Sequence, residues 1–194
     1  MAFINEKNQE INFKVVYVGP ALSGKTSSLE ALHKRTRGKS KSKMLKQESN
    51  PRTLFFDFMP LSLGKVGGYK TRFHLYSVPG QVLYEDSRNL ILKGVDGVVF
   101  VANSEVDQME ANLASLKALE SNLSDQGLQF KRFPHVIQYN KRDLKGVGEI
   151  KALKKLLNQY KAPDFETNAK KGEGIFEAFS ALAKAVIRDY AKVS

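Results

Sequence analysis

Residues 11–26 read INFKVVYVGPALSGKT, an apolar run that ends in a glycine-rich turn. The apolar run predicts a strand over Ile11–Gly19, and the amphipathic pattern that follows predicts a helix over about Lys25–Arg37. Apolar strands and amphipathic helices continue to alternate along the chain, which indicates a mostly parallel sheet with helices on both faces. We therefore expect an α/β fold, with residues 1–194 in a single domain.

The remaining elements are expected at regular intervals. Strands are predicted at TLFFDFMPL (53–61), YKTRFHLYSV (69–78), Gly97–Asn103, His135–Asn140 and about Phe165–Thr167, with a hairpin turn at LGKVGG (63–68). Helices are predicted after residue 81 and over about Asp107–Leu123, Glu149–Tyr160 and Gly174–Tyr190.

The turn at residues 19–26 has the pattern G-x-x-x-x-G-K-[ST] of a phosphate-binding loop. Its glycines let backbone N–H groups surround phosphate oxygens, and the start of the next helix adds a partial positive charge. Lys25 would neutralise the outer phosphates, and the Thr26 hydroxyl would ligate Mg²⁺. The nucleotide-binding residues expected here are Gly19, Ala21, Leu22, Ser23, Gly24, Lys25, Thr26 and Ser27.

A second motif, NKRD at residues 140–143, follows the predicted strand His135–Asn140. The Asp143 carboxylate could accept hydrogen bonds from the ring N–H and the exocyclic amine of guanine, whereas adenine offers no such pair of donors. The Lys141 stem would lie along the base, and Asn140 would connect this loop to the phosphate loop. A third group follows a short strand, and one of its backbone N–H groups would reach the guanine carbonyl oxygen: Asn168, Ala169 and Lys170.

Residues 77–81 read SVPGQ, where the loops of nucleotide switches usually read D-x-x-G-Q. The usual aspartate holds a metal-bound water, and Ser77 would hold it by a neutral hydrogen bond about half as strong. Mg²⁺ needs few protein ligands, and it keeps the phosphate oxygens and Thr26. We therefore expect nucleotide binding to survive, with faster exchange.

Hydrolysis requires an oriented water and compensation for the charge of the transition state. Gln81, beside Gly80, would position the water. Arg52 would supply the charge as an arginine finger in cis, which accelerates hydrolysis by about 10³–10⁵ when correctly placed. Thr53 would meet the γ-phosphate and Mg²⁺. Ala21 stands where glycine is common, and its Cβ could crowd the incoming arginine and the Gln81 side chain.

The order of these motifs, from the phosphate loop to TNAKKGEGIFEAF (167–179), resembles the Ras superfamily of small GTPases over nearly the whole chain. More narrowly, GPALSGKTSSLEALH, PRTLFFDFMP, YSVPGQVLYEDSR and YNKRDL are similar to the MglA family, bacterial Ras-like GTPases of cell polarity and gliding motility. The resemblance implies a P-loop GTPase fold with a six- or seven-stranded sheet. It also supports the role of Arg52.

The same resemblance implies a monomeric cytoplasmic switch that binds GTP, GDP and Mg²⁺ and hydrolyses GTP slowly without a regulator. That regulator would be a Roadblock-fold protein of the MglB type, and the GTP state would be recruited to a cell pole or to polarity and motility effectors. GTP would order switch I (about Lys39–Thr53) and switch II (about Pro79–Asn89).

The net charge of +11 comes mostly from KRTRGKSKSKMLK (34–46), which holds seven cations and no anion. This segment is either a solvated loop or a site for acidic lipid, nucleic acid or a partner. No apolar run reaches the roughly 18 residues that span a bilayer, so no integral membrane segment is expected. Three other functions remain open: a GTP-binding scaffold that does not hydrolyse, a P-loop nucleotide kinase, and nucleic-acid binding through the basic segment. The last is a poor candidate, because the basic segment is a single loop without aromatic residues.

Overall fold

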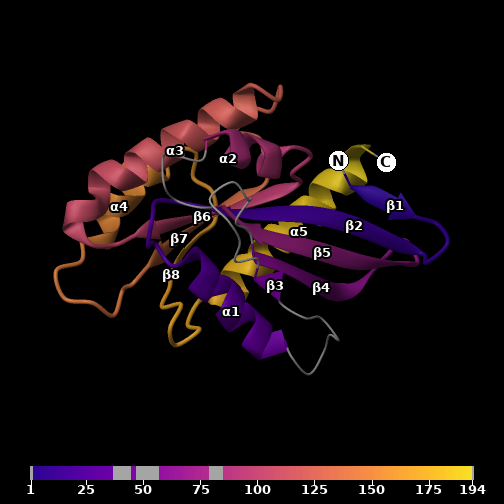
Figure 1. Ribbon diagram of the computed structural model, residues 1–194, viewed down its shortest axis with the longest axis horizontal. Helices are drawn as coiled ribbons and strands as arrows, with labels where there is room; N and C mark the ends of the chain where they lie inside the picture. The colour runs from indigo at the N-terminus through magenta and orange to yellow at the C-terminus, as the bar shows by residue number, and fades with distance from the viewer. Residues whose placement is uncertain (1, 37–44, 47–56, 79–84, 194) are drawn as a thin grey trace.

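The computed structural model describes residues 2–36, 45–46, 57–78 and 85–193. These residues form one sheet of eight strands in the order β3-β4-β5-β2-β6-β7-β8, with β1 paired to β2. The strands are β1 (Phe3–Asn5), β2 (Glu10–Val18), β3 (Leu45–Lys46), β4 (Asp57–Val66), β5 (Tyr69–Ser77), β6 (Gly97–Asn103), β7 (His135–Asn140) and β8 (Asp164–Glu166). The helices are α1 (Lys25–Thr36), α2 (Glu85–Leu92), α3 (Met109–Ser124), α4 (Ile150–Leu157) and α5 (Ile175–Val193), and a 3₁₀ turn at Val106–Gln108 precedes α3 (Figure 1).

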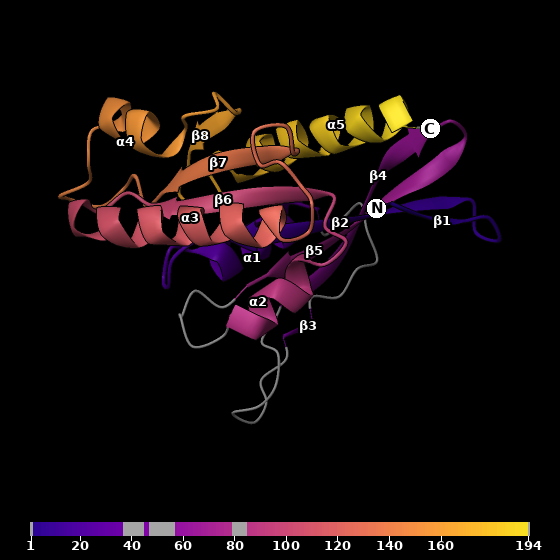
Figure 2. The ribbon, with the colours of Figure 1, turned by 90° about the horizontal axis from the view of Figure 1, so that it is seen from above.

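Strand β2 lies inside the sheet, between β5 and β6, and is buried on both faces toward its end. It pairs in parallel with β5 along nearly its whole length, and with β6 over its last four residues. Strand β1 pairs with the first part of β2, beside the stretch that β6 does not reach. Strands β1 and β4 consequently extend past the helices at one end of the molecule (Figure 2).

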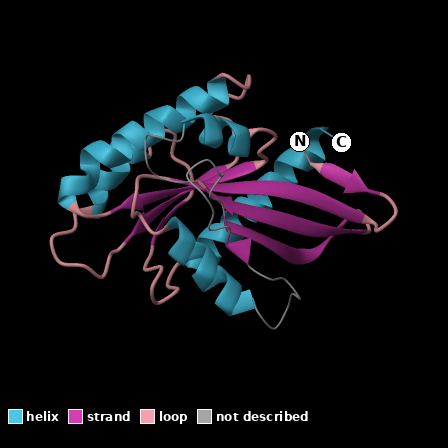
Figure 3. Ribbon diagram, in the orientation of Figure 1, coloured by secondary structure: helices cyan, strands magenta, loops and turns pink. Residues whose placement is uncertain are grey.

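Two hydrophobic cores fill the space between the sheet and its helices, and Figure 3 shows helices on both sides of the sheet. One core joins β2 to α1 and α5 through residues such as Phe13, Leu29 and Phe179. The other joins β6 and β7 to α2, α3 and α4, with Phe100 and Leu119 fully buried. All seven residues of β6 are buried, as an inner strand of a parallel sheet requires. The α/β fold class with helices on both faces is therefore confirmed.

The number of strands was underestimated, because the described residues alone form eight where six or seven were expected. The two unpredicted strands, β1 and β3, have three and two residues, too few to show an alternating pattern. Both strands form by pairing with β2 and β4, which lie elsewhere in the chain, and this pairing leaves no signal in the local sequence.

The hairpin turn predicted within residues 63–68 is present at Gly67 and Gly68, and Gly64, whose φ is also positive, stays inside β4 at a bulge. One predicted boundary was wrong for an identifiable reason. Helix α4 ends at Leu157 instead of Tyr160, because the Asn158 side chain bonds the N–H and the C=O of Ala162 and closes a turn. No helix in the described part of the chain has the length and apolarity required to span a bilayer.

Candidate functional site

The carboxyl ends of β2, β6, β7 and β8 meet at one edge of the sheet, as parallel pairing requires. In open parallel sheets, ligands bind outside this edge. The phosphate loop follows β2, the NKRD sequence follows β7, and residues 167–170 follow β8. The pairing of the strands therefore brings together segments that lie more than a hundred residues apart.

The backbone of the phosphate loop requires both of its glycines. Gly19 and Gly24 have φ of 151° and 101°, where side chains are disfavoured. A Cβ on Gly19 would overlap the Val101 carbonyl oxygen, and one on Gly24 would overlap the Asn140 amide. Leu22 also has positive φ, at 57°, and its side chain is 86% exposed. The loop thus presses closely against β6 and β7 and directs an apolar side chain outward.

Lys25 begins α1 and is buried, in spite of its charge. Its ammonium donates to Gly19 O at 2.9 Å and to Pro20 O at 2.7 Å, inside the curve of the loop. A buried ammonium group must be paired, and these carbonyl oxygens provide part of that pairing. The lysine therefore stands in the cradle that the motif assigns to phosphates. Ser28, one turn later, donates to Gly24 O at 2.9 Å and is within 3.2 Å of Gln138 Oε1.

Asn140 connects three segments of the site through its buried amide. Its Nδ2 donates to Ser23 O in the phosphate loop at 2.7 Å. Its Oδ1 accepts from Ala169 N at 3.0 Å and from Thr167 Oγ1 at 3.3 Å. The role expected of Asn140, to connect its loop with the phosphate loop, matches this geometry. The bond from Ala169 N also shows that this N–H is engaged within the protein.

A pocket of about 360 Å³ opens beside this connection, and we call it the base pocket. It gathers residues from the phosphate loop, the start of α1, the NKRD sequence and the loop after β8. Its lining is Leu22, Gly24, Ser27, Asn140, Lys141, Asp143, Leu144, Asn168, Ala169 and Lys170. Nine of these ten residues were expected from the sequence to bind nucleotide, so the structure brings the two halves of the expected site together.

Lys141 has a positive φ of 67°, and its ammonium donates to Glu105 Oε2 at 2.7 Å. Glu105 follows β6, and its own N–H donates to Asn103 Oδ1 at 3.2 Å. The hydrogen bond from Lys141 is the largest of the effects that lower the pKa of Glu105. The carboxylate thus stays charged and holds the far end of the lysine, so that the aliphatic stem borders the base pocket.

The loop after β8 is closed by its own hydrogen bonds. Asn168 N donates to Glu173 O at 3.1 Å, and Asn168 Oδ1 accepts from Lys171 N at 3.2 Å. Gly174 has a φ of 71°, and a Cβ there would overlap the Glu166 carbonyl oxygen. Within the part of the chain that the structure describes, the buried Asn168 Nδ2 has no hydrogen-bond partner.

Several expected site residues need separate mention. Arg52, Thr53, Gly80 and Gln81 lie outside the described residues, as does most of switch I. Ala21 and Thr26 are exposed residues of the phosphate loop. Ser77 is buried as the last residue of β5, paired in register with Tyr17 of β2.

Two residues of the site were not anticipated from the sequence: Glu105 and Leu144. Glu105 follows a strand at the carboxyl edge of the sheet, so strand order combined with the rule for ligand sites would have indicated it. Leu144 directly follows the NKRD sequence and carries no local signal, because an apolar residue in a loop has no distinctive pattern.

Comparison with known proteins places this geometry in a family. No family model matches the chain. The mutual gliding-motility protein MglA of Myxococcus xanthus (strain DK1622) is 50% identical to it over 193 residues, which cover 99% of this chain and 99% of that protein. Identity at this level over the full length agrees with the phosphate loop, the NKRD sequence and the base pocket described above. The chain belongs to the MglA family of Ras-like small GTPases.

Proposed function

We propose that the protein is a molecular switch that binds guanine nucleotides, hydrolyses GTP to GDP, and binds partners according to the nucleotide it holds. One observation carries this proposal: the Asn140 amide joins the phosphate loop to the pocket that Asp143 borders. A single nucleotide that fills the pocket with its base would then place its 5′ phosphates at the loop.

Base selection is assigned to Asp143, which is exposed at the rim of the base pocket. Its carboxylate would accept from the ring N–H and the amine of guanine, and a base without those donors would leave it unpaired. The stem of Lys141 would cover one face of the base. Lys170, on the opposite loop, supplies a second long side chain at the same pocket.

The phosphates are assigned to the loop N–H groups and to Lys25. The lysine already lies inside the loop on two carbonyl oxygens, so it would reach phosphate oxygens by a small displacement. Thr26, an exposed residue of the phosphate loop, offers a hydroxyl group, and Mg²⁺ prefers oxygen ligands. Thr26 and Thr53 would hold the ion, which when bound supplies positive charge against the phosphate oxygens.

Hydrolysis is assigned to Gln81 and Arg52 on the grounds of sequence. Gln81 would orient the water that attacks the γ-phosphate, and Arg52 would compensate the charge that develops there. Ser77 brings a hydroxyl instead of a carboxylate to the end of β5, which favours fast nucleotide exchange. We propose that turnover is slow until a regulator places these side chains.

The partners and the location belong to the same proposal. Similarity to a protein named for gliding motility supports a role in cell polarity and motility. The regulator would be a Roadblock-fold protein of the MglB type. The protein would be cytoplasmic, and its GTP state would be recruited to a cell pole.

The test measures nucleotide affinity and turnover in one preparation. GDP should bind more tightly than IDP, which lacks the exocyclic amine, and much more tightly than ADP. Asp143→Asn should weaken GDP binding and improve binding of xanthosine diphosphate, whose base presents an oxygen where guanine has the amine. Equal affinity of the wild type for GDP and ADP would refute the base assignment.

Turnover is followed as single-turnover hydrolysis of bound GTP with Mg²⁺. The wild type should hydrolyse GTP, and Arg52→Ala should be slower by about 10³ or more. Lys151→Ala, a change on the exposed side of α4, is the control and should behave as the wild type. If Arg52→Ala hydrolyses GTP at the wild-type rate, Arg52 is not the arginine finger. If neither the wild type nor any variant turns over alone, the assay is repeated with an MglB-type regulator, and if no turnover occurs even then, the protein is a GTP-binding scaffold.

A further inference from the structure

A second pocket, of about 580 Å³, lies between α1 and the loop that joins β8 to α5, and we call it the basic pocket. Its lining includes four cationic side chains and one carboxylate: Lys34, Arg35, Lys170, Lys171 and Glu30. Two of the cations come from the last turns of α1, and two from the loop after β8. The expected nucleotide site accounts for one of them, Lys170.

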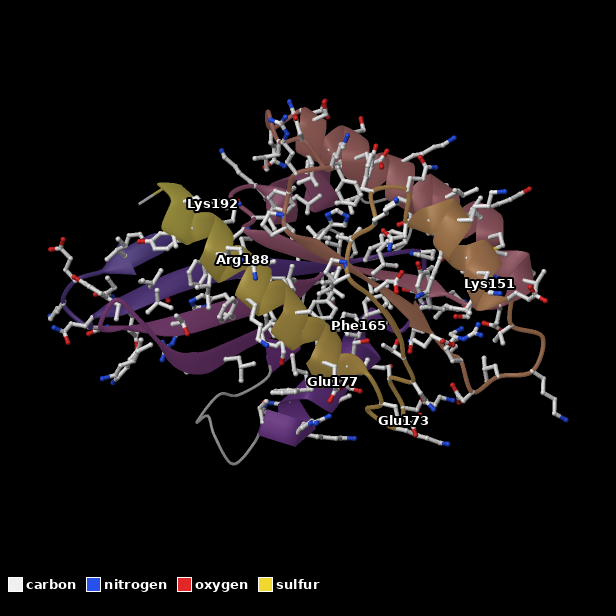
Figure 4. All side chains as sticks on the ribbon, turned by 180° about the vertical axis from the view of Figure 1, so that it is seen from behind. Lys151, Phe165, Glu173, Glu177, Arg188 and Lys192 are labelled. Carbon is white, nitrogen blue, oxygen red and sulfur yellow. The ribbon has the colours of Figure 1, made fainter. Side chains whose placement is uncertain are left out.

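Three of the four cations of this pocket are in no ion pair among the described residues. Among the ion pairs of the described residues, Arg35 binds Glu177 at 3.1 Å, and its guanidinium also lies over the Phe176 ring. Figure 4 shows Glu177 at the start of α5, next to α1. Lys34, Lys170 and Lys171 are in none of these pairs. Three ammonium groups on two facing segments are an arrangement that favours a multiply charged anion.

The basic pocket adjoins the base pocket, because both are lined by Ser27, Ala169 and Lys170. Ser27 lies beside the phosphate loop, whereas Ala169 and Lys170 lie on the base side. A nucleotide that spans these residues has its ribose between them, at the boundary of the two pockets. With the base and the 5′ phosphates in place, the 2′ and 3′ oxygens are the remaining positions that can carry a group into the basic pocket.

We propose that the basic pocket binds a phosphate or pyrophosphate group carried on the ribose 2′ or 3′ oxygen of a guanine nucleotide. This inference rests on the proposed guanine-nucleotide function. Lys34 and Lys171 bind the added phosphates, and Lys170 contacts both parts of the ligand. The same anionic chemistry is offered by free pyrophosphate, so the experiment must separate the two sources.

The test compares the Kd of three nucleotides by calorimetry at about 0.15 M salt, where exposed charges beyond about 8 Å are screened. They are GDP, guanosine 5′-diphosphate 3′-diphosphate, and guanosine 5′-diphosphate 2′-phosphate. At least one phosphorylated nucleotide should bind roughly fivefold or more tightly than GDP. Lys34→Glu and Lys171→Glu should each abolish this gain and change the Kd of GDP by less than about twofold.

Lys151→Glu is the matched control, because it reverses the charge of an exposed lysine on α4 (Figure 4). It should retain the full gain. The inference is overturned if neither phosphorylated nucleotide binds more tightly than GDP, or if the gain in affinity is unchanged in Lys34→Glu and Lys171→Glu. In either case GDP binding still supports the proposed function.

Two further arms complete the test. Inorganic pyrophosphate is added to GDP-loaded protein, and no binding is expected. If it binds with the same dependence on Lys34 and Lys171, the pocket takes a free anion, and the ribose-borne group is ruled out. If GDP itself does not bind, the proposed function fails and this inference fails with it.

Discussion

Replacing Asn140 with alanine tests the connection on which the nucleotide site depends. The change removes three buried hydrogen bonds, to Ser23 O, Ala169 N and Thr167 Oγ1. At about 1 kcal/mol each, their loss lowers the free energy of unfolding by about 3 kcal/mol. For a domain of this size that is a fall in Tm of roughly 6–12 °C. Because the phosphate loop is then no longer tied to the base pocket, the affinity for GDP should fall at least about tenfold.

The control is Asn158→Ala, at the end of α4. Asn158 also makes three hydrogen bonds, two with Ala162 and one with Asp164 Oδ2. This variant should lose stability without losing affinity for GDP. Urea unfolding of nucleotide-free protein and titration with a fluorescent GDP analogue separate the two effects. If Asn140→Ala binds GDP as well as Asn158→Ala does, the Asn140 amide does not couple the phosphate loop to the base pocket.

Three further changes address other parts of the site and the fold. In Gly24→Ala the new Cβ would overlap the Asn140 amide, at a backbone φ of 101°, so the change should abolish GDP binding as measured by titration. Normal affinity for GDP would contradict this steric overlap. Glu105→Gln removes the charge that holds Lys141, so the dissociation rate of GDP should rise roughly two- to fivefold and should depend less on salt. An unchanged dissociation rate would contradict the role of Glu105 in positioning Lys141. Burial lowers the pKa of His135 below 6.5, so the unfolded chain binds the proton more readily than the folded protein does. The free energy of unfolding should therefore fall as the pH is lowered from about 7.5 to about 5.5. His135→Gln should weaken that dependence in urea titrations, and an identical pH profile would contradict it.

These experiments separate the reading of the base from the chemistry at the phosphates. The base pocket, the phosphate loop and the Asn140 connection involve described residues, and their substitutions test binding directly. Arg52 and Gln81 are assigned from the motif pattern, so their test is the rate of turnover. A variant that binds GDP normally but hydrolyses GTP slowly would have its defect in the chemistry at the phosphates, which is assigned to Arg52 and Gln81.

Local sequence determined the parts of this protein that depend on near neighbours in the chain. The phosphate loop was predictable because its glycines, lysine and threonine act within eight residues, between a strand and a helix with clear apolar patterns. Strands β6 and β7 were predicted at their observed bounds, and the continuous apolar run in GVVFVAN marks β6 as an inner strand. The proposed recognition of guanine at Asp143 likewise rests on donors and acceptors alone.

The tertiary structure decided what depends on residues far apart in the chain. Strand pairing brings Asn140 to Ser23, across more than a hundred residues, and no local pattern contains that contact. It also places Glu105 against Lys141, which no motif indicated. The basic pocket exists because α1 lies beside the loop after β8, so Lys34 from the basic segment and Lys170 and Lys171 from that loop face one space. Local chemistry specifies which groups are present, and only the packing of the sheet and helices specifies which of them meet.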